Sequence, residues 1–506
     1  MIRSLSTSAI ALVLGAAPAL ADVTPSQVWD NLRQSYEDMG YQVQVGDQQE
    51  AGETLTLSDI TLRSQGDEAA DSQLTIPRLV MQQSGADVRS VIEGQMTLEI
   101  RDTNPEGQPA GFALTLDASG NETLSSGTPE AMDHRYAVPE LKVQGRALDE
   151  RNDSPVTMTF TDVEGQQSIR RAEDGGSQQS YDATAAEMVM ALSGSGPSEV
   201  EGAEDATDTF TANVTISDLA ITGTGTLPGG VDFGADPAAA LAAGFRGEGN
   251  LQTGPLNLTF QSSTTDSDGQ AQDANGTVSA NTGRLAVSMT GDGLTYEGRA
   301  TDMQTQVTST EMPFPLAYAT AENAFRLTVP TVARPDEQPF ALSYVLDGLT
   351  LDDAVWQSFD PQNTLPRDPA SLTIDIEGQT VVTQSFLDPA FGETGDEPQI
   401  PFLPRSLNIR DISLAAIGAS ADLSGQLTFG DDPTQPVGSI EGTFTGINGL
   451  MDNLVAMGLV PQEQLMGARM MLAMFARPVE GNPEQLQTQL EFREGGSIFA
   501  NGQQVR

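Results

Sequence analysis

Residues 55–62 read Leu-Thr-Leu-Ser-Asp-Ile-Thr-Leu, and this pattern decides the fold. Apolar and polar side chains alternate on both sides of the aspartate, as they do in a half-buried β-strand. At Asp59 the alternation slips by one residue. The slip would send Ile60 and Leu62 to the opposite face of a regular strand, so we expect a β-bulge here, a geometry that Asp and Gly accept.

The same pattern recurs three times, at residues 214–221 (VTISDLAI), 344–351 (YVLDGLTL) and 407–414 (LNIRDISL). A catalytic role for Asp59, Asp218 and Asp411 is an alternative. A structural bulge is the simpler interpretation, because it explains the same position in all four copies, including the glycine at 348. Irregular spacing between the copies argues against a regular solenoid or propeller.

Further alternating segments occur at residues 156–160, 256–260 and 372–376, and 50 glycines and 29 prolines interrupt the strands at short intervals. Short interruptions favour antiparallel meanders over βαβ crossovers. We therefore predict a mainly β fold of large curved antiparallel sheets, groove-like or sandwich-like, with a few short helices.

Helix signals are few. Thr24 and Gln27 have capping-box spacing, and they predict a leading helix from Pro25 to about Met39. Asp182 is expected to open a helix over residues 183–192, and Asp236 with Pro237 to open one over residues 238–243. The segment 355–359 predicts one further turn, and residues 450–477 predict a Met-rich helical hairpin.

The chain divides into four predicted regions. Residues 1–21 resemble a signal peptide in composition, with cleavage between Ala21 and Asp22, so we expect a periplasmic protein. Residues 22–192 form an N-terminal β-rich region with the leading helix, and residues 193–209 an acidic low-complexity linker or loop. Residues 210–506 form a C-terminal β-rich region that contains the helical hairpin.

Charge limits the choice of partners. The chain has 24 Lys and Arg against 71 Asp and Glu, and removal of Arg3 with the leader leaves 23 − 71 = −48. Such a chain repels nucleic acid and anionic membrane surfaces. No later segment approaches the apolar length of a transmembrane helix, so we expect no integral membrane segment in the mature chain. The oligomeric state is left open.

Catalytic side chains are scarce. The chain has one histidine, His134, one lysine, Lys142, and no cysteine. A Ser-His-Asp site could use only His134, and a surface or hydrogen-bonded structural histidine is the commoner case. We expect no cofactor and no metal. Residues 266–269 begin like a calcium loop but lack its closing glutamate, so Ca²⁺ binding by acidic loops is left open. A hydrolase built from two carboxylates also stays open.

The helix over residues 462–476 is nearly all apolar, with arginines on one narrow edge. Its candidate ligand-contacting residues are Leu465, Met470, Met471, Leu472, Met474 and Phe475. One interpretation is a core helix packed against the sheet. The other is a wall or plug of a lipid-binding groove, because thioether side chains adapt to varied apolar shapes.

Four segments carry a family resemblance: VWQSFDPQNTLPRDPASLTIDIEG (355–378), PRSLNIRDISLAAIGA (404–419), LVAMGLVPQEQLMGARMMLAMFARP (454–478) and FREGGSIFANGQ (492–503). The chain resembles the alphaproteobacterial secreted family called domain of unknown function 2125, over most of its mature length. The resemblance implies an exported, β-rich envelope protein and supplies no catalytic residues. More distantly, the chain is similar to AsmA-like envelope proteins, whose long sheets form lipid-handling grooves.

These observations favour a non-enzymatic periplasmic protein that binds or shuttles a lipid or another hydrophobic envelope component. The alternative is a structural or interaction protein of the cell envelope that has no small ligand. The expected partner is therefore a lipid or an envelope protein.

Overall fold

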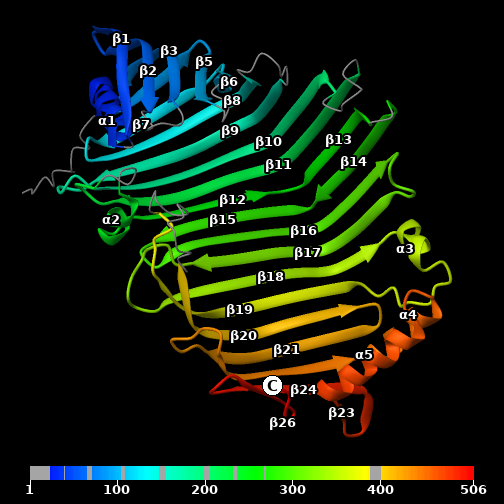
Figure 1. The fold of residues 1–506 in the computed structure, drawn as a ribbon. Coiled ribbons are helices and arrows are strands. Elements are labelled where there is room, and N and C mark those ends of the chain that lie inside the picture. The colour runs from blue at the N-terminus through cyan, green and yellow to red at the C-terminus, as the bar shows by residue number, and fades with distance from the viewer. Residues whose placement is uncertain are drawn as a thin grey trace, which may run out of the picture.

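The computed structural model describes residues 23–38, 40–64, 71–103, 109–147, 155–198, 206–231, 236–266, 269–387 and 401–506. In these ranges the chain forms one large antiparallel sheet and five short helices (Figure 1). The sheet is curved, and its first strands lie at a large angle to the strands in the middle of the chain (Figure 1). The predicted mainly β, antiparallel fold is confirmed.

The helices are α1 (Pro25–Asp38), α2 (Pro237–Ala242), α3 (Asp353–Phe359), α4 (Ile447–Ala456) and α5 (Gln462–Phe475). The strands of the first half are β1 (Tyr41–Ala51), β2 (Thr54–Ser64), β3 (Asp71–Ser84), β4 (Asp87–Glu93), β5 (Met96–Thr103), β6 (Pro109–Asp117), β7 (Glu122–Thr128), β8 (Ala131–Ala147), β9 (Val156–Arg171), β10 (Ser177–Pro197), β11 (Thr207–Leu227), β12 (Arg246–Thr253) and β13 (Leu256–Thr265). Those of the second half are β14 (Ala271–Ala280), β15 (Thr282–Thr290), β16 (Gly293–Ser309), β17 (Leu316–Val329), β18 (Gln338–Leu351), β19 (Ala370–Val382), β20 (Phe402–Ala416), β21 (Ala419–Thr428), β22 (Val437–Thr445), β23 (Arg477–Val479), β24 (Asn482–Arg493), β25 (Ser497–Ala500) and β26 (Gln503–Gln504).

The strands pair in chain order, as a meander. β8, β9, β10 and β11 each pair with the next, and β16 to β22 do the same. In two places a pair of shorter strands lies along one long strand. β12 and β13 both pair with β11, and β14 and β15 both pair with β16. Hairpin connections suffice for such an order, which explains the frequent Gly and Pro.

The bend in β2 occurs at Asp59, as predicted, although its form differs from a bulge with an extra residue. Asp59 has a φ of 53°, in the left-handed region. The pairs Val45–Ile60 and Asp47–Ser58 keep one register across it, so no residue is inserted. The apolar residues on both sides of Asp59 (Leu55, Leu57, Ile60 and Leu62) are all buried together. The left-handed residue therefore returns the apolar side chains to one face.

The other copies of the pattern bend as well. Asp218 and Gly348 have φ values of 52° and 66°. At Gly348 and at Asp411 the strand does insert a residue, because the β18–β19 register shifts between Leu346 and Leu349 and the β19–β20 register shifts at Arg410. Two further left-handed aspartates, Asp162 in β9 and Asp302 in β16, were not predicted. Asp tolerates this region better than most residues, since its short side chain can bond locally.

Two expectations are wrong. Residues 183–192 form part of strand β10 rather than a helix, and this part of β10 pairs with both β9 and β11. Pairing on both sides overrides the helix propensity of the four alanines in this segment. Residues 193–197 and 207–209 are also strand, where a linker or loop was expected, and pairs such as Ser195–Thr209 continue the sheet across the expected boundary. The centre of that segment, residues 199–205, lies outside the described residues, as do Ala21 and Asp22.

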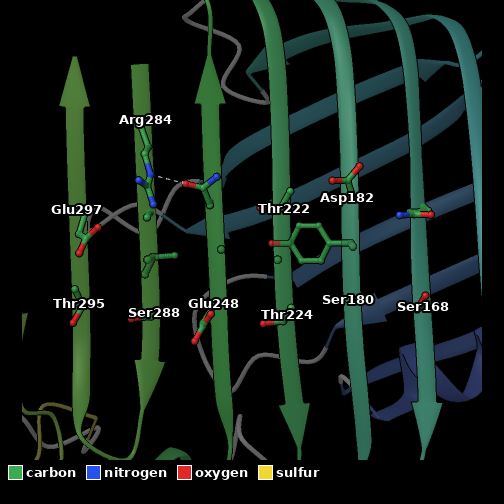
Figure 2. Close-up of a pocket in the computed structure, with 17 residues that line it drawn as sticks. Ser168, Ser180, Asp182, Thr222, Thr224, Glu248, Arg284, Ser288, Thr295 and Glu297 are labelled. Carbon is green, nitrogen blue, oxygen red and sulfur yellow. Dashed lines mark hydrogen bonds between the residues drawn. The ribbon is translucent and has the colours of Figure 1, made fainter. Parts of the chain in front are cut away.

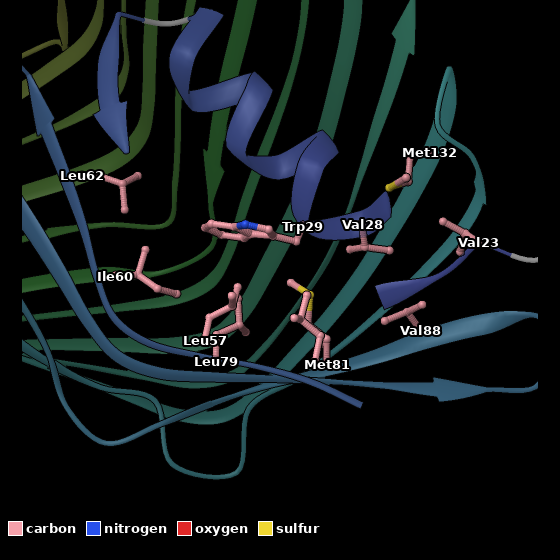
Figure 3. Packing of buried hydrophobic residues seen from close by; sticks show 11 residues of the cluster. Val23, Val28, Trp29, Leu57, Ile60, Leu62, Leu79, Met81, Val88 and Met132 are labelled. Carbon is pink, nitrogen blue, oxygen red and sulfur yellow. The ribbon is translucent and has the colours of Figure 1, made fainter. Parts of the chain in front are cut away.

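The main hydrophobic core lies between α1 and one face of β2, β3, β4 and β8. Val28 and Trp29 of α1 pack over Leu57, Leu79 and neighbouring residues (Figure 3). The capping box is present: the Thr24 backbone N–H donates to Gln27 Oε1 at 3.0 Å, and the Gln27 N–H donates to Thr24 Oγ1 at 3.3 Å. The predicted helices near residues 25, 238, 355, 450 and 462 are likewise found.

Substitution of Asp218 tests the bend. Asp218→Gly should leave the free energy of unfolding nearly unchanged, whereas Asp218→Val should lower it by about 1–2 kcal/mol, because a β-branched residue is strained at positive φ. Thr215→Val, at a paired position of the same strand, is the control. Urea unfolding measures all three. Equal effects of Val at 215 and 218 would show that residue 218 is not left-handed.

Candidate functional site

Cross-strand partners in the sheet lie on the same face, and two rows of partners define the candidate site. The first row is Tyr181, Gly223, Gly249, Val287, Tyr296, Leu327, Leu342 and Ile376. The second row is Ala183, Ile221, Leu251, Leu285, Gly298, Phe325, Tyr344 and Ile374. We call the side that carries these rows the apolar face, and the other side the polar face.

The two faces differ sharply in charge. From β12 to β22, the paired positions on the apolar face hold no Asp, Glu, Lys, Arg or His. The polar face of the same strands carries ion pairs between neighbours. Arg299 Nη2 lies 2.7 Å from Glu322 Oε2, and Arg326 Nε lies 3.3 Å from Glu297 Oε1. These pairs are exposed and contribute little stability, but they show that charge is sorted to one side.

Large apolar side chains remain exposed on the apolar face. Leu285 is 46% exposed, Phe325 44% and Leu342 42%, because no described helix or second sheet lies over them. Tyr181, Ile221, Val287, Tyr296, Leu327, Tyr344 and Leu414 are also exposed. The two rows cross eight strand lines, which at 4.7–4.9 Å per strand is about 34 Å. Monomeric soluble proteins rarely expose a contiguous apolar patch of that extent.

Aromatic rings on the apolar face lie flat across glycines of the next strand. A Cβ at Gly298 would come within 2.2 Å of the Phe325 ring, and one at Gly223 within 2.2 Å of the Tyr181 ring. Tyr136 over Gly165, Phe260 over Gly276 and Phe340 over Gly378 repeat the arrangement. Any side chain at these glycines would displace the ring. The glycines therefore let the rings cover the backbone and keep the apolar face smooth.

The polar face carries hollows lined by charged and hydroxyl side chains. One of about 550 Å³ spans β9 to β16 and is lined by Asp182, Thr222, Glu248, Arg284 and Glu297, among others (Figure 2). Arg284 Nε donates to Asn250 Oδ1 at 2.9 Å. Its lining residues include carboxylates and hydroxyls but no histidine, cysteine or lysine. For chemistry the hollow therefore offers carboxylates and hydroxyls, but no imidazole, thiol or amine.

Helix α5 is less buried than a core helix. Of the predicted candidate residues, Leu465 is buried and Leu472 half-buried, while Met470 is 74% exposed and Met471, Met474 and Phe475 are exposed. Arg469 Nη2 bonds Asp452 Oδ1 of α4 at 2.7 Å, and Asn501 Nδ2 donates to the Phe475 carbonyl at 2.9 Å. The core-helix interpretation therefore does not hold for the described chain. A role of α5 as the wall of a binding site stays a prediction.

His134 is buried in β8, on the face that α1 covers, so of the two expected cases it is the hydrogen-bonded structural histidine and not the surface one. Its Nδ1 lies 2.8 Å from Ser125 Oγ. Asp133, its chain neighbour, points elsewhere and bonds Ser168 and Arg170. Burial lowers the pKa of His134, and the nearby Asp133 charge opposes this only in part. Serine and histidine therefore meet without the acid that would complete a triad.

Metal ligands do not converge in the part of the chain that the structure describes: no three His, Asp or Glu side chains there could hold an ion. Asp266 of the suspected calcium loop accepts bonds from the Gln270 backbone N–H and from Gln272 Nε2 in a turn. Asp268 lies outside the described residues. Among the described helices, none has the length and apolar character needed to span a membrane.

Comparison with known proteins identifies the family. The sequence profile of a family described as an uncharacterized protein conserved in bacteria, DUF2125, matches residues 210–499. The chain belongs to the DUF2125 family. No curated protein and no solved structure matches the chain.

The segment matched to DUF2125 begins in β11 and ends in β25. It contains the bends at Asp218, Asp302 and Gly348, most of the apolar face, and the helices α4 and α5. The core beneath α1 lies before it. Sequence reasoning found the strands of the apolar face but not the face itself, because only the pairing register shows that their apolar residues share one side.

Methionine oxidation tests the exposure of α5. Brief treatment with hydrogen peroxide should oxidise Met466, Met470, Met471 and Met474, which are 56–74% exposed, before the fully buried Met81 and Met132. Peptide mass spectrometry measures the order. Protection of the α5 methionines to the level of Met81 would contradict the exposed helix.

The buried histidine predicts a pH dependence. The unfolded chain takes up a proton on His134 as the pH falls through 6.5, whereas the folded chain does so only at a lower pH. Stability present above pH 6.5 should therefore be lost on acidification, by at most about 1.4 kcal/mol per pH unit. Comparison of urea unfolding of the wild type and His134→Gln at pH 7.5 and 6.0 isolates this contribution. An imidazole that titrates at or above 6.5 by NMR would contradict it.

Proposed function

We propose that this DUF2125 protein is a non-enzymatic periplasmic protein that binds or carries a lipid, or another hydrophobic envelope component, on its apolar face. The observation that carries the proposal is the exposed patch across β10–β19, a surface about 34 Å long without charge. Water contact with such a surface is unfavourable, and a bound acyl chain would remove it.

Burial of an acyl chain on the apolar face would provide enough free energy for binding. A fully buried CH₂ group contributes about 0.8 kcal/mol, and a chain lying on an open face is buried on roughly half its surface. A chain of about 16 carbons would then gain roughly 6 kcal/mol before its loss of freedom is counted. The patch is also comparable in length to the ~30 Å hydrocarbon core of a bilayer, so the acyl chains of one lipid fit along it.

The chemistry of the apolar face favours an acyl chain over a polar ligand. Most side chains in its two rows, such as Val287, Leu327 and Ile376, offer no hydrogen bonds, and the flat rings of Tyr181 and Phe325 present a smooth surface. Recognition by contact area alone suits a ligand class whose members differ in chain length. The exposed methionines of α5 would adapt to such variety in the same way.

The charge distribution supports carriage through an aqueous compartment. Acidic and basic side chains occupy the polar face, and the net charge of −47 disfavours adsorption to anionic lipid surfaces. A protein of this kind would approach a membrane only briefly, collect its ligand and leave. The leader-like residues 1–21 support the periplasm as that compartment.

A pair of adjacent substitutions in β18 tests the proposal. Leu342, on the apolar face, is replaced by Glu, and Ser343, on the polar face of the same strand, is replaced by Glu as the control. Residues 22–506 are exported to a bacterial periplasm, purified without detergent, and analysed by native mass spectrometry and lipid extraction. The wild type and Ser343→Glu should carry lipid, and Leu342→Glu at least about tenfold less, because a charge on the face disrupts apolar contact.

Circular dichroism establishes that each variant is folded. Ligand-free wild type would contradict the proposal. Capture of an envelope protein in place of lipid, lost in Leu342→Glu and retained in Ser343→Glu, would also overturn it and would favour the alternative of an interaction protein.

A further inference from the structure

A separate cavity of about 210 Å³ lies beneath α1, at the covered end of the apolar face. Trp29, Leu32 and Tyr36 of α1 line its upper side, and residues of β2, β3, β4, β7, β8 and β9, with Asn121 before β7, line the rest. Figure 3 shows Trp29 above Leu57, Ile60 and Leu79 at this place. The helix thus closes a space that a regular packed core would fill.

One side of the cavity is polar. Ser90, Asn121, Thr123, Ser125, His134 and Tyr136 border it there, and none of its lining residues is Asp, Glu, Lys or Arg. His134 and Ser90 are only 3% and 6% exposed. His134 Nε2 and Ser90 Oγ have no hydrogen-bond partner, although Nδ1 of the same imidazole is occupied by Ser125.

Buried polar atoms without partners are rare and destabilise a fold, so each requires an explanation. Here two such atoms belong to residues that border one cavity, on strands β4 and β8 that flank β7. A ligand that supplied a hydroxyl or carbonyl group would satisfy one of them. The rest of the ligand would contact Leu32, Ile76, Ile92 and the other apolar lining residues.

We propose that the cavity beneath α1 is a binding site for a small neutral molecule that combines one six-membered ring with a hydroxyl or carbonyl group, and that His134 is its polar anchor. The volume of the cavity limits the ligand to about one ring with a short substituent, since an apolar cavity of about 150 Å³ already accepts benzene. The lining has no charged side chain that could pair with an ionic group, so the ligand is expected to be neutral. This site goes beyond the proposed function, because it does not require that the apolar face bind lipid.

Two matched probes, 4-ethylphenol and ethylbenzene, test the site on the full mature chain, residues 22–506. Isothermal titration calorimetry should show saturable 1:1 binding of 4-ethylphenol and at least about tenfold weaker binding of ethylbenzene, which lacks the hydroxyl group. His134 is the only histidine in the chain. Its imidazole ¹⁵N signals should therefore shift on addition of 4-ethylphenol without interference from other histidines.

Variants separate the cavity from the apolar face. His134→Phe should lose the preference for 4-ethylphenol over ethylbenzene, whereas Leu342→Glu should retain it. Should His134→Phe fail to fold, the NMR titration of the wild type still shows whether 4-ethylphenol binds next to His134. Absence of saturable binding of 4-ethylphenol, equal affinity of the two probes, or binding with an unmoved His134 signal would each overturn the proposal.

Discussion

The structure depends on a backbone constraint: an alternating strand keeps its apolar residues on one face only while the alternation is unbroken. The alternation is broken within residues 55–62, and a left-handed aspartate returns the apolar side chains to one face. In β2 the result is visible as burial of Leu55 and Ile60 on the same side. Repetition at Asp162, Asp218 and Asp302 lets long strands bend and still carry one apolar face across the sheet.

A single layer of such strands is amphipathic as a whole. Its backbone groups bond within the sheet, so the layer needs no second sheet to satisfy them. Its apolar side chains do need a cover. Where α1 supplies one, Leu57 and Met81 are fully buried; where no described element does, Phe325 and Leu342 remain more than 40% exposed. The contrast between the two ends of one face is the physical basis for the proposed binding of a hydrophobic ligand.

Much of the fold was predictable from the sequence, because strand alternation and helix caps are local signals. The bends at Asp59 and Asp218 followed from the slipped pattern, and α1 from its capping box. The predicted helix over residues 183–192 failed because pairing with β9 and β11 is a long-range effect. The candidate site was harder. Met470 and Phe475 were predicted as members of an apolar set, but their exposure to solvent was not predicted. The rows through Tyr296 and Phe325 depend on a strand register that no local pattern encodes.

Hydroxyl-radical footprinting of the delipidated monomer tests the central claim, that one face of the sheet is apolar and uncovered. The side chains to compare are Tyr296 and Phe325 on the apolar face and Trp29 beneath α1. We predict strong labelling of Tyr296 and Phe325, which are 41% and 44% exposed, and weak labelling of Trp29, which is 5% exposed. Protection of Tyr296 and Phe325 to the level of Trp29 in the monomer would mean that another layer covers the face, and would contradict the account.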